Sequence, residues 1–309
     1  MIDVLIIGSG PAGYSAGIYA ARANLNTLMV SGWEEGGQLM LTTDVENYPG
    51  FEHAVQGSHL MDQMKKQAEN VGVKMMQAMV TDVDFVSRPF SIKTDLDETI
   101  NAKTIIIATG AQAKWLGLES EKKFQGYGVS GCATCDGFFF KNKKVAVIGG
   151  GNTAVEEALY LTNHASEVIL IHRKDTLRAE KILQDRLFKN TKIKVIWNAS
   201  VKEIIGAEDP LNVTGIILNK EGSEEKIAID GVFVAIGHKP STVIFSNTTL
   251  QMDKEGYIIV QAGTTQTNIN GVFAAGDVQD KIYRQAVTAA GTGCMAALDA
   301  QKFLENNKS

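Results

Sequence analysis

Residues 2–13 read IDVLIIGSGPAG, a short apolar run that leads directly into a GxGxxG pattern. The run Val4–Ile7 is rich in β-branched residues and stops at glycine, which predicts a buried parallel strand. The alanine-rich segment 12–23 predicts a helix, and the next apolar run, Thr27–Val30, predicts a second strand. The opening therefore predicts a βαβ unit whose helix N-terminus would hold a pyrophosphate.

Each glycine of this pattern has a physical reason. Gly8 would allow the tight turn, Gly10 would let the backbone approach a phosphate, and Gly13 would let the helix pack closely on the strand. A glycine-rich turn without a ligand is the alternative, and the strand context argues against it. Because the second strand ends in Val30, Ser31 and Gly32 without an acidic residue, the ligand's ribose must be held in another way.

A second unit of the same kind begins near residue 145. An apolar run at 145–148, the sequence GGGNTA at 149–154 and another apolar run at 168–171 predict a second βαβ unit with a GxGxxA fingerprint. The runs at 104–110 and 232–237 are also alike, so we expect an internal duplication.

The C-terminal part carries a further short strand at 271–275, followed by Gly276 and Asp277, and is expected to complete one of the two domains. If it returns to the first domain, the second domain is an insertion. The predicted fold is therefore α/β, with two Rossmann-like nucleotide-binding domains, the second inserted into the first. Its expected boundaries are 1–113 with 242–309 for the first domain, and 114–241 for the second. Crossings near 111–116 and 238–243 would be the hinges.

Basic residues stand where an NAD-binding domain would carry an acidic one. His172, Arg173 and Lys174 end the second strand of the second unit, and Arg178 follows. Cationic side chains here suit a 2′-phosphate, which favours NADPH over NADH. A solvated, charged strand end is the alternative.

The cysteines point to redox chemistry. Cys132 and Cys135 form a CxxC, and Asp136 follows them, so a dithiol/disulfide couple with an adjacent proton donor is predicted. A zinc half-site fits less well because no second ligand pair completes it. For Asp136, a solvated residue beside a turn is the alternative. Cys294 is expected to be a small, buried helix residue without chemistry.

Composition narrows the class of protein. The 309 residues are 44% hydrophobic and 21% charged with a net charge of −5, which indicates a packed globular chain. We expect no nucleic-acid partner, since no basic stripe is present, and no membrane span, since no apolar stretch approaches about 18 residues. Asp3 stands where a signal peptide would be basic, so a cytoplasmic location is expected.

Taken together, the two fingerprints and the CxxC between them resemble the low-molecular-weight thioredoxin reductases. The likeness runs essentially from end to end. It is most specific at residues 8–13, 36–38, 46–50, 132–139, 149–159, 172–174, 271–277 and 283–286. The resemblance implies FAD in the first domain, NADPH in the inserted domain, thioredoxin as the partner and a homodimer.

The resemblance also implies residue roles. Cys135 would face the flavin, Cys132 would attack the partner's disulfide, and Asp136 would donate the proton. Phe138 and Phe139 resemble the apolar part of a docking surface. The implied FAD contacts are Gly8, Ser9, Gly10, Pro11, Ala12, Gly13, Gly37, Gln38, Asn47, Val80, Thr109, Gly110, Gly276, Asp277, Arg284, Gln285 and Ala286. The implied NADPH contacts are Gly149, Gly151, Asn152, Thr153, His172, Arg173, Lys174, Arg178, Ile236 and Gly237.

The predicted reaction moves electrons from NADPH through the flavin and the cysteine pair to thioredoxin. Because the nicotinamide site and the dithiol would share the inserted domain, we expect them to reach the flavin in turn, by a domain rotation. Two alternatives stay open: a flavin-dependent dithiol oxidase of the same fold, and a non-catalytic, nucleotide-binding redox sensor.

Overall fold

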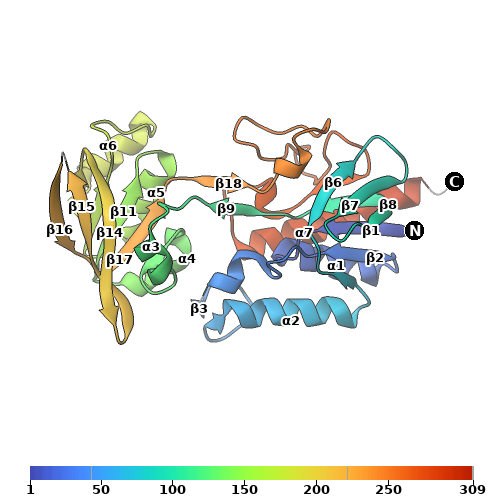
Figure 1. Cartoon of the computed structure of the whole chain (residues 1–309), viewed down its shortest axis with the longest axis horizontal. Coiled ribbons are helices and arrows are strands. Elements are labelled where there is room, and N and C mark those ends of the chain that lie inside the picture. The colour runs from blue at the N-terminus through green and yellow to red at the C-terminus, as the bar shows by residue number, and fades with distance from the viewer. Residues whose placement is uncertain (43, 221, 308–309) are drawn as a thin grey trace. The chain divides into compact units, whose positions relative to one another are not determined.

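The structure is a computed structural model that describes residues 1–42, 44–220 and 222–307. The chain divides into two compact units (Figure 1). Unit 1 runs from Met1 to Gln112 and resumes at Lys239, and unit 2 runs from Ala113 to His238. The second unit is therefore an insertion in the first.

Unit 1 is built on a seven-stranded sheet in the order β5-β2-β1-β8-β7-β6, with β19 also paired to β8. Strands β1, β2, β5, β8 and β19 are parallel, and β6 and β7 are antiparallel additions. The strands are β1 (Ile2–Ile7), β2 (Thr27–Val30), β5 (Lys74–Met76), β6 (Val80–Asp84), β7 (Phe90–Thr94), β8 (Thr99–Ile107) and β19 (Val272–Ala274). A small pair, β3 (Asp44–Val45) and β4 (Val55–Gln56), lies apart from this sheet.

The central strand β1 is buried on both faces, which is why it is apolar without alternation. Val4 and Ile6 belong to one apolar cluster with residues of the helices, whereas Leu5 and Ile7 belong to a second cluster that includes Phe245. The helices of this unit are α1 (Pro11–Arg22), α2 (Gly57–Asn70) and α7 (Ala286–Asn306), with 3₁₀ turns at Gly37–Leu41, Val243–Phe245 and Gly276–Val278.

Unit 2 repeats the topology of the first βαβ unit. Its parallel sheet has the order β10-β17-β11-β12-β13, and a separate antiparallel sheet has the order β14-β15-β16. The strands are β10 (Val129–Ser130), β11 (Lys144–Gly149), β12 (Glu167–Ile171), β13 (Ile193–Ile196), β14 (Ala199–Glu208), β15 (Leu211–Lys220), β16 (Ser223–Ala228) and β17 (Gly231–Ala235). The helices are α3 (Glu119–Phe124), α4 (Ala133–Asp136), α5 (Asn152–Leu161) and α6 (Lys181–Lys189), with a 3₁₀ turn at Gly137–Phe140.

The two crossings between the units are short strands that pair with each other, β9 (Ala111–Ala113) and β18 (His238–Pro240). The predicted fold class is confirmed, including the insertion of the second Rossmann-like domain into the first. The sequence analysis did not identify the antiparallel strands β6, β7 and β14–β16. Among the described residues, no helix is long and apolar enough to cross a membrane.

Candidate functional site

The first phosphate loop joins β1 to α1, and two of its glycines are required by sterics. A Cβ on Gly8 would lie 2.3 Å from the carbonyl oxygen of Ala108, and a Cβ on Gly13 would lie 2.0 Å from that of Gly8. A Cβ on Gly10, in contrast, would meet no atom within 4 Å. The loop is therefore closed on its protein side and open at Gly10, where a pyrophosphate fits.

Ser9 ties this loop to the neighbouring segments. Its buried Oγ donates a hydrogen bond to the carbonyl of Ser31 at 3.1 Å and accepts one from the amide of Gly36, also at 3.1 Å. The Cβ position of Gly37 would lie 3.6 Å from Cα of Gly10. The Gly36–Gly37 turn therefore packs beside the open glycine of the loop.

A cavity of about 350 Å³ opens at the ends of β1 and β2. It is lined by Ile7, Gly8, Val30, Ser31, Gly32, Ala78, Met79, Val80, Thr109, Gln112, Lys239, Pro240, Ser241, Val243 and Ile244. Because its walls are mostly apolar and it adjoins Gly8, it suits the adenosine part of a dinucleotide. Gln112, Lys239 and Ser241 were not predicted from the sequence, because they belong to the crossing segments and are part of no motif.

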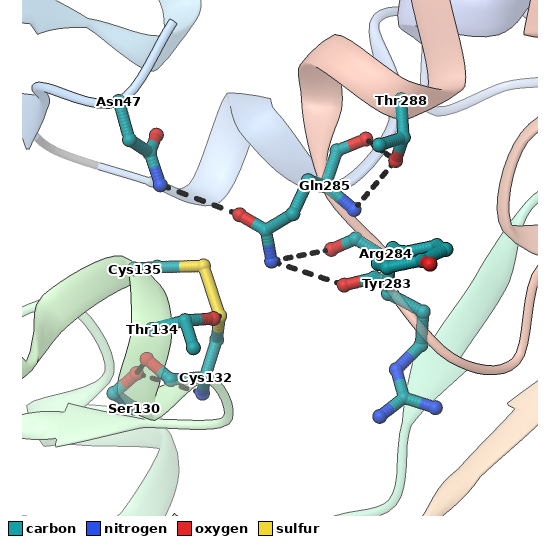
Figure 2. Close-up of a disulfide and its surroundings, with 9 residues drawn as sticks. All are labelled: Asn47, Ser130, Cys132, Thr134, Cys135, Tyr283, Arg284, Gln285 and Thr288. Carbon is teal, nitrogen blue, oxygen red and sulfur yellow. Dashed lines mark hydrogen bonds between the residues drawn. A yellow bond between two sulfur atoms is a disulfide. The ribbon is translucent and has the colours of Figure 1, made fainter. Parts of the chain in front are cut away.

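Asn47 and Gln285 meet through their side chains, and both are labelled in Figure 2. The Asn47 amide donates to Oε1 of Gln285 at 3.4 Å, and the Gln285 amide donates to the carbonyls of Tyr283 and Arg284. Gln285 is the N-cap of α7 and exchanges hydrogen bonds with Thr288 in a capping box. The start of α7 is thereby held in place.

Asp277 lies in the 3₁₀ turn between β19 and α7. Burial, with a smaller contribution from Asp280, raises the pKa of the Asp277 carboxyl to about 7. A carboxyl group that is half-protonated near neutral pH can donate as well as accept a hydrogen bond, as a polyhydroxyl chain requires.

The other predicted FAD contacts of unit 1 lie around the same loop. Gln38 donates through its side-chain amide to the carbonyl of Ala111. Thr109 donates to the carbonyl of Ser241 at 2.8 Å, and the amide of Gly276 donates to Thr292 at 2.9 Å. Pro11 and Ala12 begin α1, Ala286 begins α7, Val80 begins β6, and Gly110 follows β8 with a positive φ.

The second phosphate loop, between β11 and α5, repeats this design. A Cβ on Gly149 would lie 2.4 Å from the carbonyl oxygen of Ala235, whereas a Cβ on Gly151 would meet nothing within 4 Å. Asn152 begins α5 and accepts a hydrogen bond from the amide of Glu180 at 2.8 Å. Thr153 is the next residue of this helix.

The basic residues predicted to contact NADPH differ in their exposure to solvent. Arg173, Lys174 and Arg178 are exposed, whereas His172 is only 5% exposed. Burial, assisted by the charges of Arg178 and Arg173, lowers the pKa of His172. Two predicted NADPH contacts, Ile236 and Gly237, follow β17, and Ile236 is 37% exposed. Strand β11 lies between β17 and β12, the strand that His172 follows.

Cys132 and Cys135 form a disulfide with an S–S distance of 2.07 Å and a Cα–Cα distance of 5.3 Å (Figure 2). Cys132 is the N-cap of α4, and both residues are partly exposed. The Cys132 amide donates to Oγ of Ser130 at 3.0 Å, and its Sγ lies 3.3 Å from Oγ1 of Thr134. The described residues contain no cluster of three or more His, Cys, Asp or Glu side chains that could hold a metal ion.

Asp136 ends the same short helix. Burial raises the pKa of its carboxyl, and a hydrogen bond with Ser130 opposes this shift in part. Its amide donates to the carbonyl of Cys132 at 3.2 Å. The acid is thus held near the cysteine pair and is shifted toward its protonated form.

Exposed aromatic side chains follow the cysteine pair. Phe138 is 58% exposed and packs edge-on against Phe139 and His164, with both pairs of ring centroids 6.2 Å apart. Cys294 differs from its prediction: it lies on α7 but is only half-buried, and it interacts with the exposed Tyr19 of α1.

The family described as pyridine nucleotide-disulphide oxidoreductase matches residues 2–293. A thioredoxin reductase of Rickettsia bellii is 62% identical over 303 residues, 97% of each chain. The chain belongs to the thioredoxin reductases.

Solved structures agree with this membership. A thioredoxin reductase from Streptococcus pyogenes is 41% identical, with a TM-score of 0.94 and 99% of each chain covered. A protein of Pseudomonas fluorescens named glucosaminate ammonia-lyase is also 51% identical, over 98% of this chain and 95% of its own. As a thioredoxin reductase, the chain uses FAD and NADPH, and its two open phosphate loops fit two dinucleotides.

Proposed function

We propose that the protein reduces the disulfide of thioredoxin with electrons from NADPH, with FAD bound by unit 1 and NADPH by unit 2. The observation that carries this proposal is the partly exposed Cys132–Cys135 disulfide, which lies in the same unit as the second phosphate loop. FAD, when bound, supplies a carrier that accepts a hydride and delivers two electrons to a disulfide.

The cysteine pair performs two exchanges. Two electrons convert the Cys132–Cys135 disulfide to a dithiol. The Cys132 thiolate then attacks one sulfur of the partner's disulfide, forming a mixed disulfide and releasing the other partner sulfur as a thiolate. Cys135 attacks Sγ of Cys132, which frees the reduced partner and restores the internal disulfide.

Asp136 is assigned the proton transfer. Because burial raises the pKa of its carboxyl, a fraction is protonated when the partner's thiolate leaves, and it can donate that proton. Phe138 and Phe139 are assigned to the apolar part of the docking surface for thioredoxin, since both are exposed beside the cysteine pair.

The two reactions of unit 2 take place in turn. The dithiol and the proposed nicotinamide site belong to unit 2, whereas the flavin is assigned to unit 1. A change in the orientation of unit 2 at β9 and β18 therefore brings the dithiol and the nicotinamide to the flavin in turn. A crosslink between the units should therefore stop turnover but preserve one half-reaction, measured separately by stopped flow. Both half-reactions at the original rates would contradict this movement.

The protein is further proposed to form a homodimer and to be located in the cytoplasm. An apolar strip of unit 1 on α1 and α7 supports the dimer, because Tyr19, Val287, Met295 and Leu298 are all at least 40% exposed. Sedimentation of wild-type protein and a Leu298→Lys variant would test it, with a shift toward monomer expected for the variant.

Substitution of each cysteine tests the reaction itself. Cys132→Ser and Cys135→Ser should each reduce thioredoxin turnover to background, while NADPH still bleaches the flavin band, because the hydride step needs neither sulfur. Cys294→Ser is the matched control and should keep turnover. Thioredoxin turnover in either of the first two variants would contradict the assigned roles.

The same preparation separates the rival functions. Rapid NADPH consumption in air without thioredoxin would indicate a dithiol oxidase, and flavin binding without any disulfide turnover would indicate a sensor. Release of ammonia from glucosaminate would indicate the activity named for the Pseudomonas relative. The partly exposed Cys132–Cys135 disulfide supports the reductase.

A further inference from the structure

Gly150 occupies a position where the GxGxxA fingerprint does not call for glycine. Its backbone is not left-handed, so conformational freedom does not explain it. The reason is steric: a Cβ at Gly150 would lie 2.2 Å from Cε1, 2.3 Å from Nδ1 and 2.7 Å from Nε2 of His172. The imidazole ring occupies the space that any other side chain would take.

The ring of His172 is itself confined. The His172 amide donates to the carbonyl of Ile196 at 2.9 Å, and its carbonyl accepts from the amide of Ala199 at 3.1 Å. The Trp197 ring packs edge-on against the imidazole at 6.3 Å. Within the described part of the chain, Nε2 is buried and has no hydrogen-bond partner. The ring is therefore confined by packing, and its other polar contacts are to the backbone of Thr176 and Gly149.

Gly150 also connects the phosphate loop to the basic segment. Its carbonyl accepts a hydrogen bond of 2.7 Å from the amide of Arg178. Arg173, Lys174 and Arg178 are the exposed cations proposed to read the 2′-phosphate. One residue of the loop thus contacts both ends of this segment, through the His172 ring and through the Arg178 amide.

We infer that His172 is a positioning residue. Its ring packs against Gly150 and sets the distance between the pyrophosphate loop, residues 149–154, and the segment proposed to bind the 2′-phosphate, residues 173–178. This inference rests on the proposed NADPH site of unit 2. It differs from the role that the family resemblance implied, in which His172 contacts the coenzyme beside its basic neighbours.

The properties of the imidazole fit positioning better than phosphate binding. Phosphate is bound best by accessible, charged donors. His172 is 5% exposed, and burial lowers its pKa, which disfavours the charged form of the ring. The three exposed cations next to it are better placed to bind an anion.

The test compares a ligand that spans both phosphate sites with one that uses a single site. Calorimetry on the FAD-loaded protein would measure binding of NADP⁺ and of adenosine 2′-monophosphate. His172→Ala should weaken NADP⁺ binding roughly threefold to tenfold, because the two sites lose their spacing, and should change adenosine 2′-monophosphate binding less than twofold. Arg173→Ala is the matched control and should weaken both ligands.

A double-mutant cycle tests the contact itself. Gly150→Ala should weaken NADP⁺ binding about tenfold or more, since the added methyl group displaces the ring. Adding His172→Ala to Gly150→Ala should recover part of that loss, because the space becomes free. Thermal melting and retained flavin absorbance identify any variant that fails to fold, and His172→Ala alone with the two ligands then carries the test.

Several outcomes would overturn the inference. Equal weakening of both ligands by His172→Ala would make the imidazole a phosphate ligand, and additive losses in the cycle would mean that the contact has no influence. A wild-type protein that binds no NADP⁺ would instead overturn the proposed NADPH site, together with the inference built on it.

Discussion

The two phosphate loops share their glycine geometry but are braced differently. In both loops the first glycine faces a carbonyl oxygen and the second is open. At the intervening position, unit 1 has Ser9, whose hydroxyl bonds to Ser31 and Gly36, whereas unit 2 has Gly150, which is covered by the His172 ring. Each loop is thus tied to the end of its second strand, in unit 1 by the hydrogen bonds of a serine hydroxyl and in unit 2 mainly by the packing of a histidine ring.

This difference shows that the glycine fingerprint does not determine the residue between its first two glycines. The glycines meet a local steric requirement that is the same in both units. The residue between them has no fixed requirement, so each unit uses it for its own neighbours. The strand ends differ accordingly: Ser31 adjoins a largely apolar cavity, whereas His172 is followed by exposed cations.

The largest expected effect comes from the shared glycine. Gly8→Ala would combine a strained φ of +109° with a Cβ 2.3 Å from a carbonyl oxygen. Strain and overpacking each cost about 1–3 kcal/mol, so FAD should be lost and the melting temperature lowered. Gly149→Ala should keep FAD and lose NADPH. Gly291→Ala, at an open helical position, is the control for both, and unchanged flavin absorbance in Gly8→Ala would show that the loop does not hold FAD.

The next effect concerns the exposed cations of unit 2. Arg173→Ala with Lys174→Ala should reduce kcat/KM for NADPH while leaving that for NADH nearly unchanged. Charge-assisted hydrogen bonds contribute roughly 1.5–3 kcal/mol each, which corresponds to about tenfold to a hundredfold per side chain. Steady-state rates with both coenzymes measure the effect, and Lys181→Ala, another exposed lysine, is the control. Equal losses with both coenzymes would mean that these residues do not read the 2′-phosphate.

A smaller effect is expected at the brace of unit 1. Ser9→Ala removes the acceptor for the buried Gly36 amide, and an unpaired buried group costs about 1–3 kcal/mol. Denaturant unfolding should show that loss, and FAD should bind more weakly. Ser223→Ala, which removes an exposed hydroxyl, should leave stability unchanged. Equal stability of the two variants would mean that Ser9 does not brace the loop.

The pH-dependent effect concerns Asp277, which lies in the turn after β19. Its pKa is raised from 3.8 to about 7, so folding favours the protonated form. The stability that this form contributes is present below pH 3.8 and is lost as the pH rises toward 7. In the FAD-free protein, Asp277→Asn should therefore raise the melting temperature more at pH 8 than at pH 5. Asp82→Asn, at an exposed position, should show no such difference.

Local patterns were sufficient for the framework of both units. The strand at Thr27–Val30 and the helix after Gly10 were predicted closely, because apolar runs and glycine-rich turns act over a few residues. The second unit followed for the same reason, and the fold class was confirmed. The assignments of individual cofactor contacts remain predictions.

Other features depend on residues that are distant in sequence. The cavity brings Ser31 together with Lys239 and Ser241, and no short motif links these positions. The strands β14–β16 show little regular alternation, because much of this sheet is exposed, and they were therefore missed. The apolar pattern that locates a strand is local, whereas pairing of exposed strands depends on neighbours that only folding supplies.

The protonation states illustrate the same limit. Asp136 and Asp277 are ordinary acidic residues in the sequence, and burial by the folded chain raises the pKa of each. His172 stands among basic residues that look alike in sequence, but packing against Gly150 and Trp197 separates it from them. Residue types and spacing were enough to predict two nucleotides and a redox pair. The charge and accessibility of each side chain depended on tertiary packing, because desolvation is set by all the atoms that surround a group.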